Sequence, residues 1–177
     1  MFVLGIDPGL SRCGFGGVLE EHGAQRAVAA GVITSDPALP LPARLAELHR
    51  ELVALVGELK PDLVAVERVF FQTNARTAMA VGQASGIALL TAAEHGCAVV
   101  EYTANEVKLA VAGYGSADKA QVQQMVTRLL RLPAVPDPPD VADALALALC
   151  HLAAGRFTDL VRSAAGEGLV APGVTRR

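Results

Sequence analysis

A leucine stripe set between two short apolar runs is the feature that most constrains how this chain folds. The stripe spans residues 41–59, where leucine recurs at steps of four and three, so that every leucine lies on one side of a helix. The apolar runs at residues 2–6 and 63–66 are typical of short buried strands. Because a helical crossover joins strands that run in the same direction, these two strands are predicted to be parallel neighbours in an α/β sheet.

Two further strands are predicted between the first apolar run and the leucine stripe. Gly14, Gly16 and Gly17 punctuate a strand that reaches about residue 19, and residues 26–34 form the next one. Short turns separate these strands, which is typical of an antiparallel meander. The sheet is therefore predicted to be mixed, with antiparallel and parallel pairs.

The pattern after residue 66 adds one strand and several helices. We expect a helix at 74–95, a strand at 98–102, a helix that Thr103 and Glu106 open as a capping box, a helix with its N-cap at Ser116, and a final helix that ends near Gly155. This order predicts a five-stranded mixed sheet flanked by helices. Residues 1–155 are expected to form one domain and residues 156–177 a poorly ordered tail.

Four acids occupy the ends of these predicted elements. Asp7 and Glu67 end the two parallel strands, and the carboxyl ends of such strands are where open α/β sheets place ligands. Asp140 and Asp143 are three residues apart, so they share a face of the final helix. Gathered acids repel one another unless a cation lies among them, and oxygen ligands without a His or Cys cluster favour Mg²⁺ or Mn²⁺. The acids therefore predict metal-assisted phosphodiester chemistry.

Other interpretations of the same acids stay open at this point. Asp140 would serve equally as an N-cap, and Asp143 as a first-turn acid that the helix dipole favours. The run of Asp7, Pro8 and Gly9 is also typical of the phosphate-binding half of the actin, sugar kinase and Hsp70 superfamily. Those ATPases need two such domains, whereas 177 residues provide room for one.

Charge and composition limit the possible binding partners and the cellular compartment. The formal net charge of −3 by itself argues against a nucleic-acid partner, but two bound divalent ions would make the net charge positive. Basic residues also gather in the middle of the chain. Three widely separated cysteines suit neither a disulfide framework nor a zinc site, which favours a reducing cytoplasm. The most apolar stretch, residues 142–154, is too short to span a membrane, and the first residues lack the features of a signal peptide.

Four motifs together resemble the RuvC family of bacterial Holliday junction resolvases. They occur in order over residues 1–153, and each alone would be a weak signal. The motifs are LGIDPG at Leu4–Gly9, VERVF at Val66–Phe70, GSADKAQV at Gly115–Val122 and ADALA at Ala142–Ala146.

The resemblance implies an RNase H-like nuclease that works as a homodimer and cuts four-way DNA junctions by two symmetric incisions. It implies that the four acids bind the catalytic metal, Mg²⁺ with Mn²⁺ as a substitute, as two ions per active site. It also implies a RuvA–RuvB branch-migration complex as a partner. The small-residue helix at 74–95 is the expected dimer surface. By motif match the metal-binding catalytic acids are Asp7, Glu67, Asp140 and Asp143.

Residues that contact DNA follow from the same resemblance. Phe70 matches an aromatic residue that stacks on a base near the crossover, and Lys108 and Lys119 match lysines near the scissile phosphate. Arg76, from the basic middle of the chain, is a further candidate for DNA contact. Phe71, Asp137 and the tail receive no role.

Two other functions are compatible with part of this sequence pattern. An RNase H-like nuclease acting on another nucleic acid, such as RNA, would use the same acids, and Phe70 and a dimer with two separated sites favour the junction. A non-catalytic binding module with degraded acids is disfavoured because all four acids are present.

Overall fold

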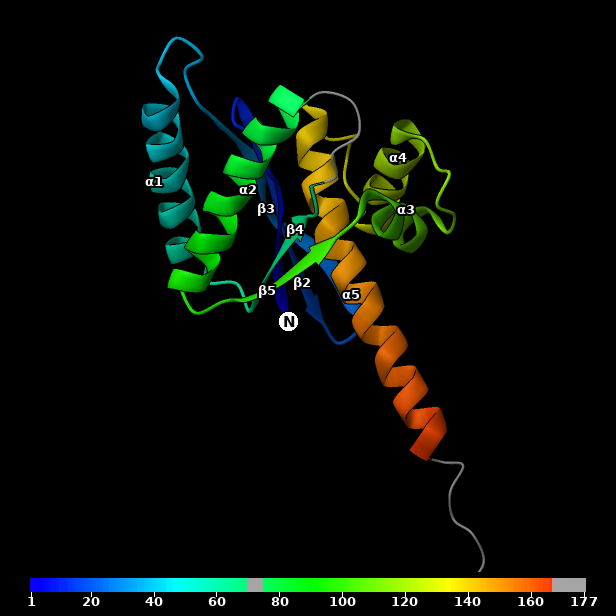
Figure 1. Cartoon of the computed structure of the whole chain (residues 1–177). Coiled ribbons are helices and arrows are strands. Elements are labelled where there is room, and N and C mark those ends of the chain that lie inside the picture. The colour runs from blue at the N-terminus through cyan, green and yellow to red at the C-terminus, as the bar shows by residue number, and fades with distance from the viewer. Residues whose placement is uncertain (70–74, 167–177) are drawn as a thin grey trace, which may run out of the picture.

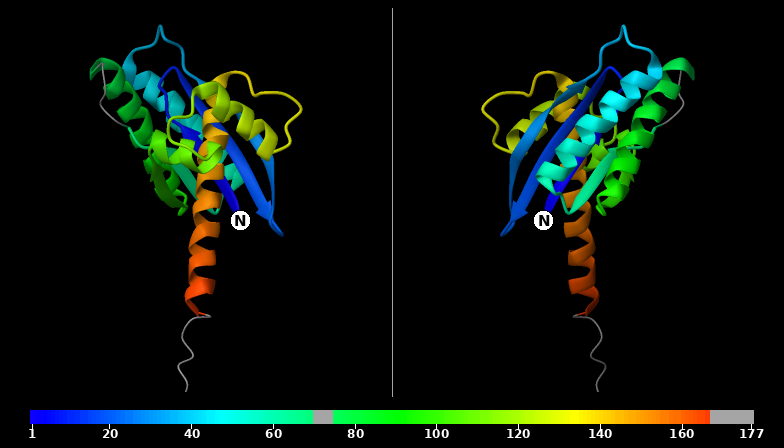
Figure 2. Two further views of the ribbon diagram at one scale, coloured as in Figure 1. Left: turned by 90° about the vertical axis from the view of Figure 1, so that its right-hand side faces the viewer. Right: turned by 90° about the vertical axis from the view of Figure 1, so that its left-hand side faces the viewer.

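A central sheet with helices on both faces forms the molecule, as the computed structural model shows in Figures 1 and 2. The structure describes the backbone of residues 1–69 and 75–166, and the side chains of residues 1–69 and 78–155. Its strands are β1 (Phe2–Asp7), β2 (Arg12–Glu21), β3 (Ala24–Thr34), β4 (Leu63–Glu67) and β5 (Ala98–Tyr102). Its helices are α1 (Leu41–Leu59), α2 (Ala75–Glu94), α3 (Ala104–Ala112), α4 (Lys119–Leu129) and α5 (Pro139–Gly166).

The five strands lie in the order β3-β2-β1-β4-β5, which confirms the predicted mixed sheet. β1 pairs with β2 and β2 with β3 in antiparallel fashion, as a meander requires. β4 pairs with β1 and with β5 in parallel fashion. The leucine stripe therefore does form the crossover helix, α1, between two parallel neighbours.

One face of the sheet is covered by α1 and α2. Leu48, Leu52 and Val56 of α1 are fully buried and pack in one cluster with Leu4 and Ile6 of β1. Alternate residues along β1 point to opposite faces, so Val3 belongs to the cluster on the other side. Small side chains of α2 join the same cluster, and they are Ala84, Ala88 and Ala92.

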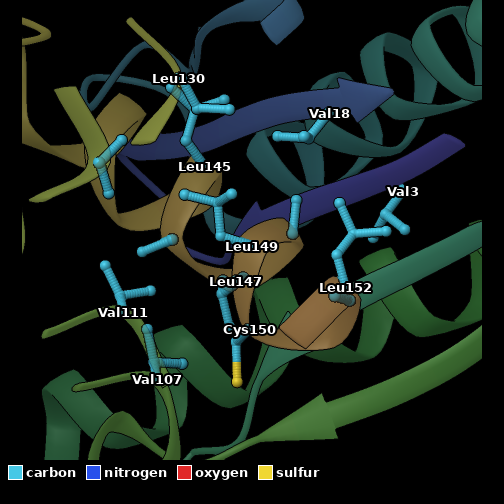
Figure 3. Packing of buried hydrophobic residues seen from close by; sticks show 14 of the residues in the cluster. Val3, Val18, Val107, Val111, Leu130, Leu145, Leu147, Leu149, Cys150 and Leu152 are labelled. Carbon is cyan, nitrogen blue, oxygen red and sulfur yellow. The ribbon is translucent and has the colours of Figure 1, made fainter. Parts of the chain in front are cut away.

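The opposite face is covered by α5, with α3 and α4 packed against its outer side (Figure 1). Figure 3 shows Leu145 and Leu149 of α5 in the buried cluster that also holds Val3 and Val18 of the sheet. A Cβ on Gly5 would collide with the backbone carbonyl of Ala144, so glycine lets the helix approach the strand closely. This contact fixes the height of α5 above the sheet.

Two predicted helix ends differ from the structure. The N-cap of α4 is Asp118 and not Ser116, because Asp118 and Gln121 form a reciprocal capping box that satisfies two backbone N–H groups. The final helix continues past Gly155 to Gly166, since a single glycine costs an α-helix only about 1 kcal/mol. The capping box predicted for Thr103 and Glu106 is confirmed.

A membrane-spanning helix is absent from the described part of the chain: no helix there is both long and apolar enough.

Candidate active site

Two of the four predicted acids lie side by side at the end of the parallel strands. Ile6 of β1 is paired with Val66 of β4, so Asp7 and Glu67 follow at the same edge of the sheet. Burial raises the pKa of Asp7 to about 7, and the charges of Glu67, Asp143 and Asp140 add to the effect. Burial also raises the pKa of Glu67, while a hydrogen bond from Asp7 opposes that rise. Loss of the proton from Asp7 is therefore disfavoured until the pH reaches about 7.

The other two acids come from the first turns of α5. The helix begins at Pro139, so Asp140 lies inside its first turn and is not the N-cap. A Cβ on Gly14 of β2 would collide with the carbonyl of Asp140, which shows how closely the helix start lies on the strand. Glycine near the start of β2 is thus what lets the two helix acids approach the strand acids.

Asp143 is paired with a lysine. The Nζ of Lys119, at the start of α4, lies 2.6 Å from Oδ2 of Asp143. This hydrogen bond raises the pKa of Lys119 and keeps its ammonium group charged. Lys119 is 60% exposed in its side chain, so a charged group reaches the acids from solvent.

Asp140 is paired with an arginine in a different manner. Nη2 of Arg12, the first residue of β2, lies 3.2 Å from Oδ2 of Asp140. That oxygen is buried and has no hydrogen-bond partner among the described residues, so the contact has the distance of an ion pair without hydrogen-bond geometry. Asp140 is therefore held by charge more than by a directed bond.

A cleft of about 450 Å³ opens in front of the acids. Asp7, Glu67 and Asp143 line it, together with Lys108 of α3 and Lys119 of α4. Such a cleft suits a substrate with a negatively charged group. Metal ions on the three acids would hold that group from one side, and the two lysine ammonium groups would hold it from the other. Asp140 does not line the cleft. Its remaining lining is formed by Ala104, Val107, Val122, Ala146 and Leu147.

The acid cluster offers the oxygen ligands that a hard divalent cation prefers, but its side chains are not in a metal-binding arrangement. No group of three or more His, Cys, Asp or Glu side chains in residues 1–69 and 78–155 is placed to hold a metal ion. Asp7 and Glu67 have raised pKa values, which disfavour their joint ionisation, and Asp143 and Asp140 are each paired with a basic side chain. Oδ2 of Asp140 accepts no hydrogen bond from the described part of the chain, and all the possible ligand atoms are oxygens. Both features fit Mg²⁺ or Mn²⁺ once the proton has left and the basic side chains have moved away.

The remaining sequence predictions fall outside what the structure describes, or outside the cleft. Phe70 and Phe71 lie outside the described residues, and Arg76 belongs to α2 but its side chain is likewise outside them. Asp137 is exposed and does not line the cleft. The DNA-contact roles predicted for Phe70 and Arg76 therefore stay predictions.

Sequence reasoning missed Arg12 and the two glycine contacts. The signal for the glycines was present, because glycine inside an apolar strand marks the close approach of another backbone. Arg12 gave no such signal, since its partner Asp140 is far away in the sequence and the pairing depends on how α5 crosses β2.

Comparisons with known proteins give one family. The family model described as crossover junction endodeoxyribonuclease RuvC matches residues 3–151. A relative of that name from Salinispora arenicola is 54% identical over 166 residues, which are 93% of this chain and 95% of the relative. Another, from Alkaliphilus oremlandii, is 48% identical over 162 residues, which are 92% of this chain and 99% of the relative.

Solved structures show the same likeness. The structure of Thermus thermophilus RuvC with its Holliday junction substrate superimposes with a TM-score of 0.83 at 36% identity, over 89% of this chain and 96% of that one. The yeast mitochondrial Holliday junction resolvase Ydc2 superimposes with a TM-score of 0.66 at 14% identity, over 94% of this chain and 86% of that one. The second likeness concerns the fold alone.

Proposed function

The chain belongs to the RuvC family of crossover junction endodeoxyribonucleases, and from that premise we propose that it resolves four-way (Holliday) DNA junctions during recombination and repair. The observation that carries the proposal is the meeting of Asp7, Glu67 and Asp143, from three different elements, on one cleft with two lysines. The reported relatives are deoxyribonucleases by name, so RNA as the substrate is not favoured.

In this proposal the four acids hold two divalent ions, Mg²⁺ with Mn²⁺ as a substitute. Such ions would supply an activated water for in-line attack on the phosphodiester and a positive charge for the leaving 3′ oxygen. Asp7 and Glu67 are rigidly placed by the sheet, while Asp143 and Asp140 are carried by α5. The protein supplies no nucleophile of its own.

Lys108 and Lys119 are proposed to contact the phosphates beside the scissile bond, because both line the cleft from the side of α3 and α4. Phe70 follows β4 by three residues and is proposed to stack on a base near the crossover. Arg76 is proposed as a further phosphate contact. Affinity for the junction would then come mainly from phosphate contacts and fall steeply with salt.

We propose that the enzyme works as a homodimer built on α2. Met79 and Leu90 of this helix are 61% and 50% exposed, and Gly82 and Gly86 between them have open space where a Cβ would stand. These residues recur at steps of three and four, so they form one solvent-facing stripe that a second copy of the helix would cover. A two-fold dimer would place two clefts on a two-fold junction.

The dimer is tested by light scattering on purified protein. Leu90→Glu is expected to yield monomers, whereas Leu129→Glu, which changes a leucine that is 42% exposed on α4, is expected to leave the dimer intact. A wild-type monomer at micromolar concentration would contradict the proposal. The same copies would work in the cytoplasm with a RuvA–RuvB branch-migration complex as partner.

Cleavage is tested with a synthetic mobile four-way junction whose strands are labelled in turn. In Mg²⁺ or Mn²⁺ we expect paired cuts in two strands of like polarity, at symmetric positions, and products that a ligase seals. Equal cleavage of a linear duplex, or cleavage of RNA in preference to the junction, would contradict junction resolution.

A further inference from the structure

Arg12 is the feature of the acid cluster that the proposed chemistry does not use. Its guanidinium group lies 3.2 Å from Oδ2 of Asp140, and its side chain is 56% exposed while that of Asp140 is 18% exposed. One partner of the pair is thus largely in solvent and the other largely in the protein. A pair of this kind can open from the solvent side without loss of core packing.

We propose that Arg12 is a positioning residue that holds Asp140 in the metal-free enzyme and competes with the divalent metal ion for the same carboxylate oxygen. The inference rests on the proposed function, since it needs a metal ion among the acids. Oδ2 is buried and lacks a hydrogen-bond partner, so the oxygen that Arg12 approaches still has full capacity to coordinate a metal. The guanidinium and the ion cannot both occupy that position.

The backbone that carries Arg12 is fixed, so only its side chain is free to leave. Ser35 donates a hydrogen bond to the carbonyl of Leu10 at 2.5 Å, and Arg44 donates to Oγ of Ser11 at 2.7 Å. The first bond ties the turn after β1 to the segment that follows β3, and the second ties that turn to α1. Displacement of Arg12 would therefore be a rotation of one side chain and not a rearrangement of the turn.

Direct competition makes a definite prediction about metal affinity. Removing Arg12 removes the competitor, so Mn²⁺ should bind more tightly even though a residue beside the cluster has been lost. A partly exposed ion pair of this kind contributes modestly, so the expected gain in Mn²⁺ affinity is about 2- to 5-fold. A residue that merely supported the shape of the site would, on removal, weaken binding.

The experiment is calorimetric titration of the protein with Mn²⁺ in the absence of DNA. Arg12→Gln is expected to bind Mn²⁺ about 2- to 5-fold more tightly than the wild type. The matched control is Arg26→Gln, which removes an arginine of β3 that is paired at 3.9 Å with Glu21. It lowers the net charge equally and is expected to leave the affinity unchanged. Thermal unfolding in chelator establishes that both variants fold.

A second background separates competition from general charge effects. In Asp140→Asn the competed oxygen no longer carries charge, so adding Arg12→Gln should change Mn²⁺ affinity by less than about 1.5-fold. An equal gain in both backgrounds, or unchanged or weaker binding in Arg12→Gln alone, overturns the assignment. Wild-type protein that binds no Mn²⁺ would instead contradict the proposed metal site, so the two failures are distinguishable.

Discussion

The strand acids and the helix acids of the cluster are stabilised in opposite ways. Asp7 and Glu67, at the ends of β1 and β4, have each other as neighbours and reduce their repulsion by retaining a proton. Asp143 and Asp140, on α5, each lie beside a basic side chain that compensates their charge. The carboxyl groups at the strand ends are thus stabilised by a proton, whereas those on α5 are stabilised by a lysine or arginine side chain.

This difference shows what metal binding must overcome on each side. The strand pair must lose a proton, which becomes easier as the pH rises through about 7. For the proposed metal ions to bind the helix pair, Lys119 and Arg12 must move away from Asp143 and Asp140.

Loss of any acid should abolish cleavage whichever side it belongs to. Asp7→Asn, Glu67→Gln and Asp143→Asn are each expected to reduce the cleavage rate by about 10³-fold or more, because each removes a proposed ligand of the catalytic ions. Junction binding, measured by gel shift, should persist because it depends on phosphate contacts elsewhere. A variant that cuts near the wild-type rate in Mg²⁺ would remove its acid from the site.

Asp140 and Asp137 offer a matched pair for the same assay. Asp140→Asn is expected to be inactive, whereas Asp137→Asn should keep most of the activity, since Asp137 is exposed and precedes the helix. Retained cleavage in Asp140→Asn together with its loss in Asp137→Asn would show that the loop, and not the helix, supplies the fourth ligand.

Stability should separate the strand acids from the helix acids. The pKa of Asp7 is raised from 3.8 to about 7 in the folded state, so its protonated form stabilises the fold below about pH 4 and that stability is lost as the pH rises to 7. In chelator at pH 8, Asp7→Asn should therefore raise the free energy of unfolding by about 2–4 kcal/mol. The gain should disappear at pH 4, where the wild-type carboxyl is protonated too.

Urea denaturation at the two pH values measures this effect. Asp137→Asn is the control, because it removes an exposed acid and should change little at either pH. A fall in stability for Asp7→Asn at pH 8 would mean that Asp7 has a structural role that outweighs the repulsion.

The helix side should give a smaller change of opposite sign. Asp143→Asn removes the partner of Lys119, whose side chain is 60% exposed, so solvent already screens the pair. In chelator at pH 8 we expect a loss of about 0.2–1 kcal/mol in the free energy of unfolding. A gain as large as that of Asp7→Asn would show that Asp143 is repelled by the strand acids more than it is held by Lys119.

Much of this arrangement was predictable because it depends on local patterns. The leucine stripe of residues 41–59 determined that β1 and β4 are parallel, and that placed Asp7 beside Glu67. The spacing of Asp140 and Asp143 placed both on one helix face. Helix ends were predicted less well, as Asp118 shows, because several neighbouring residues were able to cap α4.

What the sequence did not predict depends on contacts between distant elements. The pairing of Arg12 with Asp140 exists only because α5 crosses β2 closely enough for Gly14 to be required. No periodicity encodes a crossing of that kind. The DNA-contact roles proposed for Lys108 and Lys119 come from the family resemblance, and the structure places both residues on the cleft.

The length of α5 has a practical use. One unbroken helix runs from the turn that carries Asp140 to Gly166, and Figure 1 shows it extending beyond the sheet. Gly155 is exposed, has open space around it and lies about 18 Å along the axis from Asp143. A fluorescent or spin probe at that position would be carried by the same helix as the carboxylates of Asp140 and Asp143. It would report their rotation while remaining far from any bound DNA strand in the cleft.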